Sequence, residues 1–87
     1  MPVYLVELLV FLKPLARDPE AETILAELER RGYASVRGLR VGKVYRFEVE
    51  AQDCSEAERL VLELGGRLRF YNPVVHAAEA RCLGEKS

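Results

Sequence analysis

The sequence predicts one α+β domain with the element order βαββαβ, in which two helices cover one face of a four-stranded antiparallel sheet. Two segments carry apolar residues at helical spacing, and each follows an aspartate that can cap a helix. Segments rich in β-branched residues precede, separate and follow these helices. The length of 87 residues is that of one small domain.

The first predicted strand, from Val3 to Leu12, is apolar on both faces. One face carries Tyr4, Val6, Leu8, Val10 and Leu12, and the other carries Val3, Leu5, Leu9 and Phe11. Glu7 is the only charged residue of the segment. A strand with one face in water alternates apolar and polar residues, so this pattern indicates a central strand covered on both sides.

The first predicted helix runs from about Pro19 to Arg31. Asp18 can accept hydrogen bonds from the free backbone N–H groups, and proline fits the first helical position. The apolar stripe consists of Ala21, Ile24, Leu25 and Leu28. Gly32 supplies the left-handed residue that commonly ends a helix.

A β-hairpin is predicted next. Its strands span residues 36–41 and 44–51, and a tight turn at Gly42 and Lys43 joins them. The second strand alternates between apolar and charged residues, which indicates that one of its faces is in water.

The second helix is predicted to begin at Asp53, which forms a capping box with Glu56. Its apolar spacing continues through Gly65 and Gly66, so we expect it to reach about Arg69. A last strand spans residues 74–82. We take residues 1–83 as a single domain and residues 84–87 as a short polar tail.

This order is that of the ferredoxin-like fold, a two-layer sandwich with the spatial strand order 4-1-3-2 and both helices on one face. The other face stays open, with the two-sided apolar strand at its centre. Four bare apolar side chains there would expose on the order of 400 Å², near the upper limit for soluble monomers. We therefore expect a second copy to cover this face through Leu5, Glu7, Leu9 and Phe11.

Charge and the start of the chain argue against several classes of partner. The 13 basic and 14 acidic residues are scattered and give a net charge of −1, so no positive field attracts nucleic acid or anionic lipid. The first residues lack the basic segment of a signal peptide, and no apolar run is long enough to span a membrane. We expect a cytoplasmic protein.

The sequence offers no catalytic, cofactor-binding or metal site. Cys54 and Cys82 have no CxxC spacing, and we expect both to be reduced. The single histidine, His76, has no obvious orienting acid and is expected to be structural. The glycines form no phosphate-binding loop.

Basic residues cluster around the predicted hairpin turn. Arg40 and Lys43 flank Gly42, which permits close backbone approach. One interpretation is an ordinary turn with solubilising charge. The other is that Arg40, Gly42 and Lys43 contact acidic groups of a partner.

The chain resembles the PurS subunit family of phosphoribosylformylglycinamidine synthase. The resemblance rests on the ending of the first strand, the opening and closing of the first helix, the basic segment and the entry to the last strand. These are Leu12-Lys13, Asp18-Pro19, Gly32-Tyr33, Arg40-Val41-Gly42-Lys43 and Asn72-Pro73-Val74-Val75. They cover nearly the whole chain in a consistent order.

The resemblance implies a non-catalytic subunit that forms a homodimer or a tetramer. It would join the ATP-dependent synthetase subunit to the glutaminase subunit in purine biosynthesis, so that ammonia passes between them. ATP and Mg would be used by the complex and not bound by this chain.

Two other families share the fold plan. A ligand-binding ACT-like regulatory domain would usually carry a glycine in the loop after the first strand, where this chain has residues 13–17 without glycine. An acylphosphatase-like enzyme would need an arginine in that loop and a nearby asparagine. Arg17 is available, but Asn72 lies in the wrong connection.

Overall fold

The computed structural model describes residues 1–14 and 17–86. The elements along the chain are β1 (Val3–Leu12), α1 (Pro19–Arg30), β2 (Gly42–Glu50), α2 (Cys54–Arg67) and β3 (His76–Glu85). Leu15 and Ala16 of the predicted first loop and Ser87 of the predicted tail lie outside the described residues.

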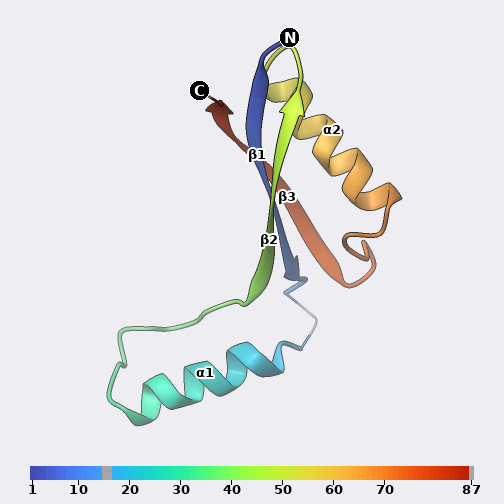
Figure 1. Cartoon of the computed structure of the whole chain (residues 1–87). Coiled ribbons are helices and arrows are strands. Elements are labelled where there is room, and N and C mark those ends of the chain that lie inside the picture. The colour runs from blue at the N-terminus through green and yellow to red at the C-terminus, as the bar shows by residue number, and fades with distance from the viewer. Residues whose placement is uncertain (15–16, 87) are drawn as a thin grey trace.

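The sheet has three antiparallel strands in the order β2-β1-β3 (Figure 1). The central position of β1 is as predicted, but the four-stranded sheet is wrong. Residues 36–41 form no strand, and Gly42 and Lys43 begin β2 instead of making a hairpin turn. The physical reason is register: Gly42 pairs with Phe11, next to the last residue of β1, so the residues before Gly42 lie beyond the end of the sheet.

The prediction of two helices on one face is also wrong. Helix α2 packs on β3 and β1, with a smaller contact to β2, whereas α1 contacts no other helix or strand of the described chain. Figure 1 shows α1 below the sheet and directed away from it. The first turn of α1 is tied instead to the returning segment, where the Val41 N–H donates to Asp18 Oδ2 at 3.3 Å.

The core lies between α2 and the face of the sheet that it covers. Its buried residues come from β1, from the end of β2 and from α2, and they are Val6, Leu8, Val10, Val49, Ala51, Ala57 and Val61. Phe70 follows α2 and extends this core over β2, with ring centroids 5.1 Å from Tyr45 and 5.9 Å from Phe47. Helix α2 and Phe70 thus cover most of the face that two helices were expected to cover, and Tyr45 and Phe47 stay partly exposed.

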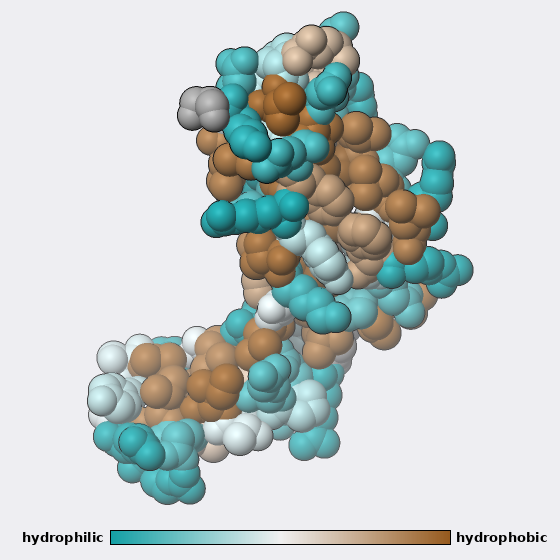
Figure 2. All heavy atoms as spheres, in the orientation of Figure 1, coloured by the Kyte–Doolittle hydropathy of each residue, from teal (hydrophilic) through white to brown (hydrophobic). Residues whose placement is uncertain are grey.

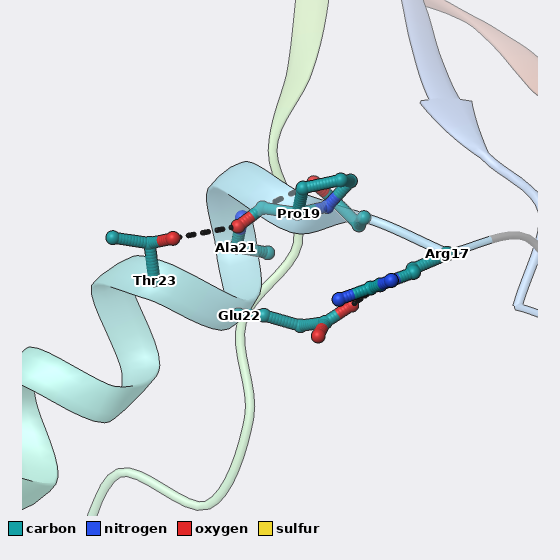
Figure 3. Close-up of polar contacts among 6 residues, drawn as sticks. Arg17, Pro19, Ala21, Glu22 and Thr23 are labelled. Carbon is teal, nitrogen blue, oxygen red and sulfur yellow. Dashed lines mark hydrogen bonds and ion pairs between the residues drawn. The ribbon is translucent and has the colours of Figure 1, made fainter.

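Both predicted helix starts are confirmed. Asp18 accepts from Ala21 N at 3.1 Å, and Asp53 accepts from Glu56 N at 2.8 Å. Figure 3 shows the start of α1, where Thr23 Oγ1 also donates to the Pro19 carbonyl at 2.9 Å.

Helix α2 passes through Gly65 and Gly66, as predicted, and ends at Arg67. The glycines permit close packing: a Cβ on Gly65 would lie 2.9 Å from Leu8 Cδ2 and 3.2 Å from the Tyr71 ring. Gly65 therefore lets α2 approach the core closely, because a side chain at this position would clash with Leu8.

The cysteines correct a further expectation. Cys54 and Cys82, expected to be reduced, form a disulfide with a Cα–Cα distance of 5.6 Å. The two residues are 28 positions apart, and the fold of α2 onto β3 brings them together.

Candidate partner-binding surfaces

The first candidate surface is the face of the sheet opposite α2. Val6, Leu8 and Val10 are at most 5% exposed beneath α2, so the alternating residues of β1 point the other way. The structure thus brings the predicted self-association residues together on the open face, and all four are half-buried there. They are Leu5, Glu7, Leu9 and Phe11.

A row of charges crosses the middle of this open face. Glu7 pairs in register with Arg46 on β2 and Arg81 on β3. Its carboxylate lies 2.8 Å from Arg46 Nε, and its side chain is only 16% exposed, compared with 73% for Arg46. Leu5 lies on one side of this +−+ row and Leu9 on the other, while Glu48 and Glu79 lie opposite them on the neighbouring strands.

The apolar surface at Leu9 extends from β1 onto the neighbouring strand β2. Val44 lies opposite Leu9 on β2 and is 55% exposed. Because a β-branched residue on an edge strand gains stability when its face is covered, the exposed Val44 adds to the case for a partner here.

The second candidate surface is the basic segment before and at the start of β2. Arg40 is engaged within its own chain: its Nη2 donates to the Leu12 carbonyl at 2.5 Å, and its guanidinium lies 5.1 Å from the centroid of the Phe11 ring. Gly42 is required by packing, since a Cβ there would lie 2.3 Å from the Val10 carbonyl oxygen.

Lys43 remains available to a partner. Within residues 1–14 and 17–86 it has no ion-pair partner, and it is exposed. It lines a cavity of about 340 Å³ together with Val10, Phe70 and His76. Of the three residues predicted to bind a partner, Arg40 and Gly42 thus serve the packing of their own chain, and Lys43 is exposed.

The third candidate surface is the apolar stripe of α1, which sequence reasoning assigned to the chain's own core. Ala21 is buried, but Ile24 is 41% exposed, and Leu25 and Leu28 are only half-buried. Figure 2 shows apolar surface along this end of the molecule and a hollow between it and the rest. The sequence could not predict that this surface is exposed, because the apolar spacing of α1 is the same whether the helix packs on its own sheet or on another chain.

His76 takes part in the hydrogen bonds of the turn before β3. Its Nδ1 accepts from Asn72 N at 3.0 Å, and Asn72 Oδ1 accepts from Val74 N at 2.9 Å. These bonds shape the turn into β3.

The described part of the chain holds no group of three or more His, Cys, Asp or Glu residues placed to bind a metal ion. None of its helices has the length and apolarity to cross a membrane.

Comparison with known proteins gives one consistent family. The family model described as "PurS: Phosphoribosylformylglycinamidine (FGAM) synthase" matches residues 5–84. The phosphoribosylformylglycinamidine synthase subunit PurS of Thermotoga maritima is 35% identical over 81 residues, which cover 93% of this chain and 98% of the relative. The same subunit of Archaeoglobus fulgidus is 38% identical over 64 residues, which cover 74% and 79%.

A solved structure agrees with these relatives. The structure of PurLQS from Thermotoga maritima contains a chain that is 34% identical, with a TM-score of 0.80. The match covers 95% of this chain and 100% of that one.

Proposed function

The chain belongs to the PurS family of phosphoribosylformylglycinamidine synthase subunits, and we propose that it acts within that enzyme as a bridge that performs no chemical step. It is a subunit of the synthase in purine biosynthesis, and the complex is the enzyme. Family membership disfavours the ACT-like regulatory domain that shares the fold plan.

The bridge would join the ATP-dependent synthetase subunit to the glutaminase subunit. The observation that carries this proposal is the likeness over 95% of the chain to a chain of the PurLQS structure. Ammonia released by a glutaminase is lost to water unless the two active sites are held in position, so positioning is the contribution required of a third subunit. ATP and Mg would be used by the complex and not bound by this chain, which would work in the cytoplasm.

Self-association is the second part of the proposal. We infer that the open face pairs with the same face of a second copy. The +−+ row favours this partner, because rotation about a two-fold axis can set the Arg46 and Arg81 of one copy beside acidic residues of the other, such as Glu48 and Glu79.

Helix α1 would supply a second contact between copies. It has an apolar stripe without a partner among the described elements. The sheet has half-buried aromatic residues on β2, Tyr45 and Phe47, beside the region that α2 covers least. A stripe and an incompletely covered face on the same chain are complementary, so reciprocal docking would bury both. Two independent contacts of this kind would permit a tetramer.

The test is reconstitution with the synthetase and glutaminase subunits. We expect the three chains to co-purify, and glutamine-dependent synthesis to rise when this chain is added. Synthesis driven by free ammonia is the control, because it needs no transfer between subunits and should change little. Equal glutamine-dependent activity with and without this chain would refute the bridging role.

A further inference from the structure

We propose that Cys54 and Cys82 form a reversible redox site whose disulfide fastens the first turn of α2 to the edge strand β3. The Cα–Cα distance of 5.6 Å lies in the range that a disulfide requires. They are the chain's two cysteines, so neither has a competing thiol in the same chain.

The surroundings keep the two residues adjacent without the covalent bond. Cys54 begins α2, and Glu58 follows one turn later on the same side of the helix. The Glu58 carboxylate accepts from the Cys82 backbone N–H at 2.8 Å. Because β3 is an edge strand of the described sheet, this N–H has no strand partner on its outer side among residues 1–14 and 17–86, and the carboxylate satisfies it. A reduced pair would therefore stay in place and close again.

The two cysteines lie at the edge of the core. Cys54 and Cys82 are each half-buried, whereas their core neighbours Ala57 and Val6 are at most 1% exposed. A small thiol or disulfide would therefore not need to open the core to approach them. Thiol–disulfide exchange proceeds by attack of a thiolate on a sulfur atom, so access sets whether the bond is reversible.

Closure by a low-molecular-weight disulfide balances as follows. The thiolate of one cysteine attacks the small disulfide, forms a mixed disulfide and releases one small thiol. The thiolate of the other cysteine then attacks the protein sulfur of the mixed disulfide and releases the second small thiol. Both cysteines are oxidised, and the small disulfide is reduced to two thiols. A small thiol in excess reverses each step.

The bond matters for stability because α2 is the helix that covers the core. A link across 28 positions restricts the unfolded chain and also fixes the start of α2 on β3. We expect oxidation to raise the thermal midpoint by roughly 10–20 °C, from the usual effect of a loop this long in a domain this small.

The experiment uses the full chain, treated either with oxidised glutathione or with dithiothreitol. Expected results are no free thiol and a single-chain species on a non-reducing gel after oxidation, two free thiols after reduction, and recovery of the higher midpoint on reoxidation. The control is the double variant Cys54→Ser/Cys82→Ser, whose midpoint should match the reduced chain and ignore both reagents.

Several results would overturn the proposal. Two thiols that stay free in excess oxidised glutathione would show that no bond forms, and a disulfide-linked dimer would show the wrong pairing. If the bond forms but the thermal midpoint stays the same, the disulfide does not stabilise the fold and the proposed fastening of α2 to β3 is wrong. These measurements on the unaltered chain hold even if the double variant fails to fold.

Discussion

At Gly42 the backbone of β2 meets β1 closely enough to exclude any side chain. The Val10 carbonyl oxygen and the Phe11 ring would lie 2.3 Å and 2.6 Å from an added Cβ. The carbonyl belongs to the central strand and cannot move without disturbing both of its neighbours. Gly42, which the sequence analysis placed in a tight turn, is therefore needed because β2 packs closely against β1.

Gly42→Ala should lower the free energy of unfolding by about 1–3 kcal/mol, because the strand must shift to relieve the clash. Gly38→Ala is the matched control: a Cβ there meets nothing within 4 Å, so its effect should stay within about 0.5 kcal/mol. Urea denaturation measures both. Equal stability of the two variants would contradict the close approach at Gly42.

The neighbouring cations differ in what they do. Arg40→Ala should cost about 1 kcal/mol of stability, since it removes a hydrogen bond to the Leu12 carbonyl and a contact with the Phe11 ring. Lys43→Ala should leave the thermal midpoint almost unchanged.

Lys43→Ala should instead weaken binding to the synthetase subunit by roughly 1 kcal/mol at low salt, and by less at high salt, because exposed charges are screened. Affinity measured across a salt series checks this expectation. Undiminished affinity of the Lys43 variant would remove the last of the three predicted partner-binding residues.

At the scale of elements, β1 separates folding from association by its two faces. Leu8 is fully buried under α2, whereas Leu5 and Leu9 are half-buried on the open face. The same substitution placed on opposite faces therefore tests which face serves which purpose.

Leu8→Glu should prevent folding, because an unpaired charge would enter the core at a cost of several kcal/mol. Leu9→Glu should leave the chain folded and weaken self-association, with Leu9→Met as a volume-conserving control. Circular dichroism reports folding, and sedimentation reports association. A Leu9→Glu chain that associates like the unaltered one would exclude the open face as the contact.

Helix α1 permits a similar comparison on its two sides. Ile24→Glu should weaken self-association while the chain keeps the secondary structure of α1, because the stripe has no partner element in the described chain. Ala26→Glu adds the same charge at another exposed position and should have little effect. If both variants associate normally, the stripe does not contact a second copy.

At the scale of the whole molecule, the chain is more extended than a compact domain. Its radius of gyration is 16.1 Å, with extents of 51 × 30 × 14 Å. A compact domain of this length would have a radius of gyration of about 12 Å. The larger radius of gyration comes from α1 and from residues 31–41, which connect α1 to β2 and lie beyond the end of the sheet (Figure 1).

Such a shape leaves apolar surface that association would bury, so we expect the chain to sediment at micromolar concentration with at least twice its own mass. Scattering should give a dimer more compact for its mass than the single chain. A stable monomer at that concentration would contradict self-association through either surface.

The sequence by itself determined where both helices start and where the first strand lies. The caps at Asp18 and Asp53 placed both helix starts, and the apolar residues on both faces of β1 put that strand at the centre of the sheet. Which of its two faces lies under α2 was decided by the tertiary structure. The PurS resemblance is confirmed by the family match over residues 5–84. These features depend on residue spacing and nearby hydrogen bonds, which a linear pattern contains.

Only the tertiary structure decided which elements meet. It placed α1 away from the sheet, left residues 36–41 without a strand partner, turned Arg40 back onto Phe11 and joined Cys54 to Cys82. An apolar stripe, a β-branched segment or a cysteine has the same pattern whether its partner lies in the same chain, in another chain or nowhere. The pairing of β2 with β1 starts at Gly42 opposite Phe11, near the end of β1. Residues 36–41 therefore lie beyond the sheet and cannot form the fourth strand.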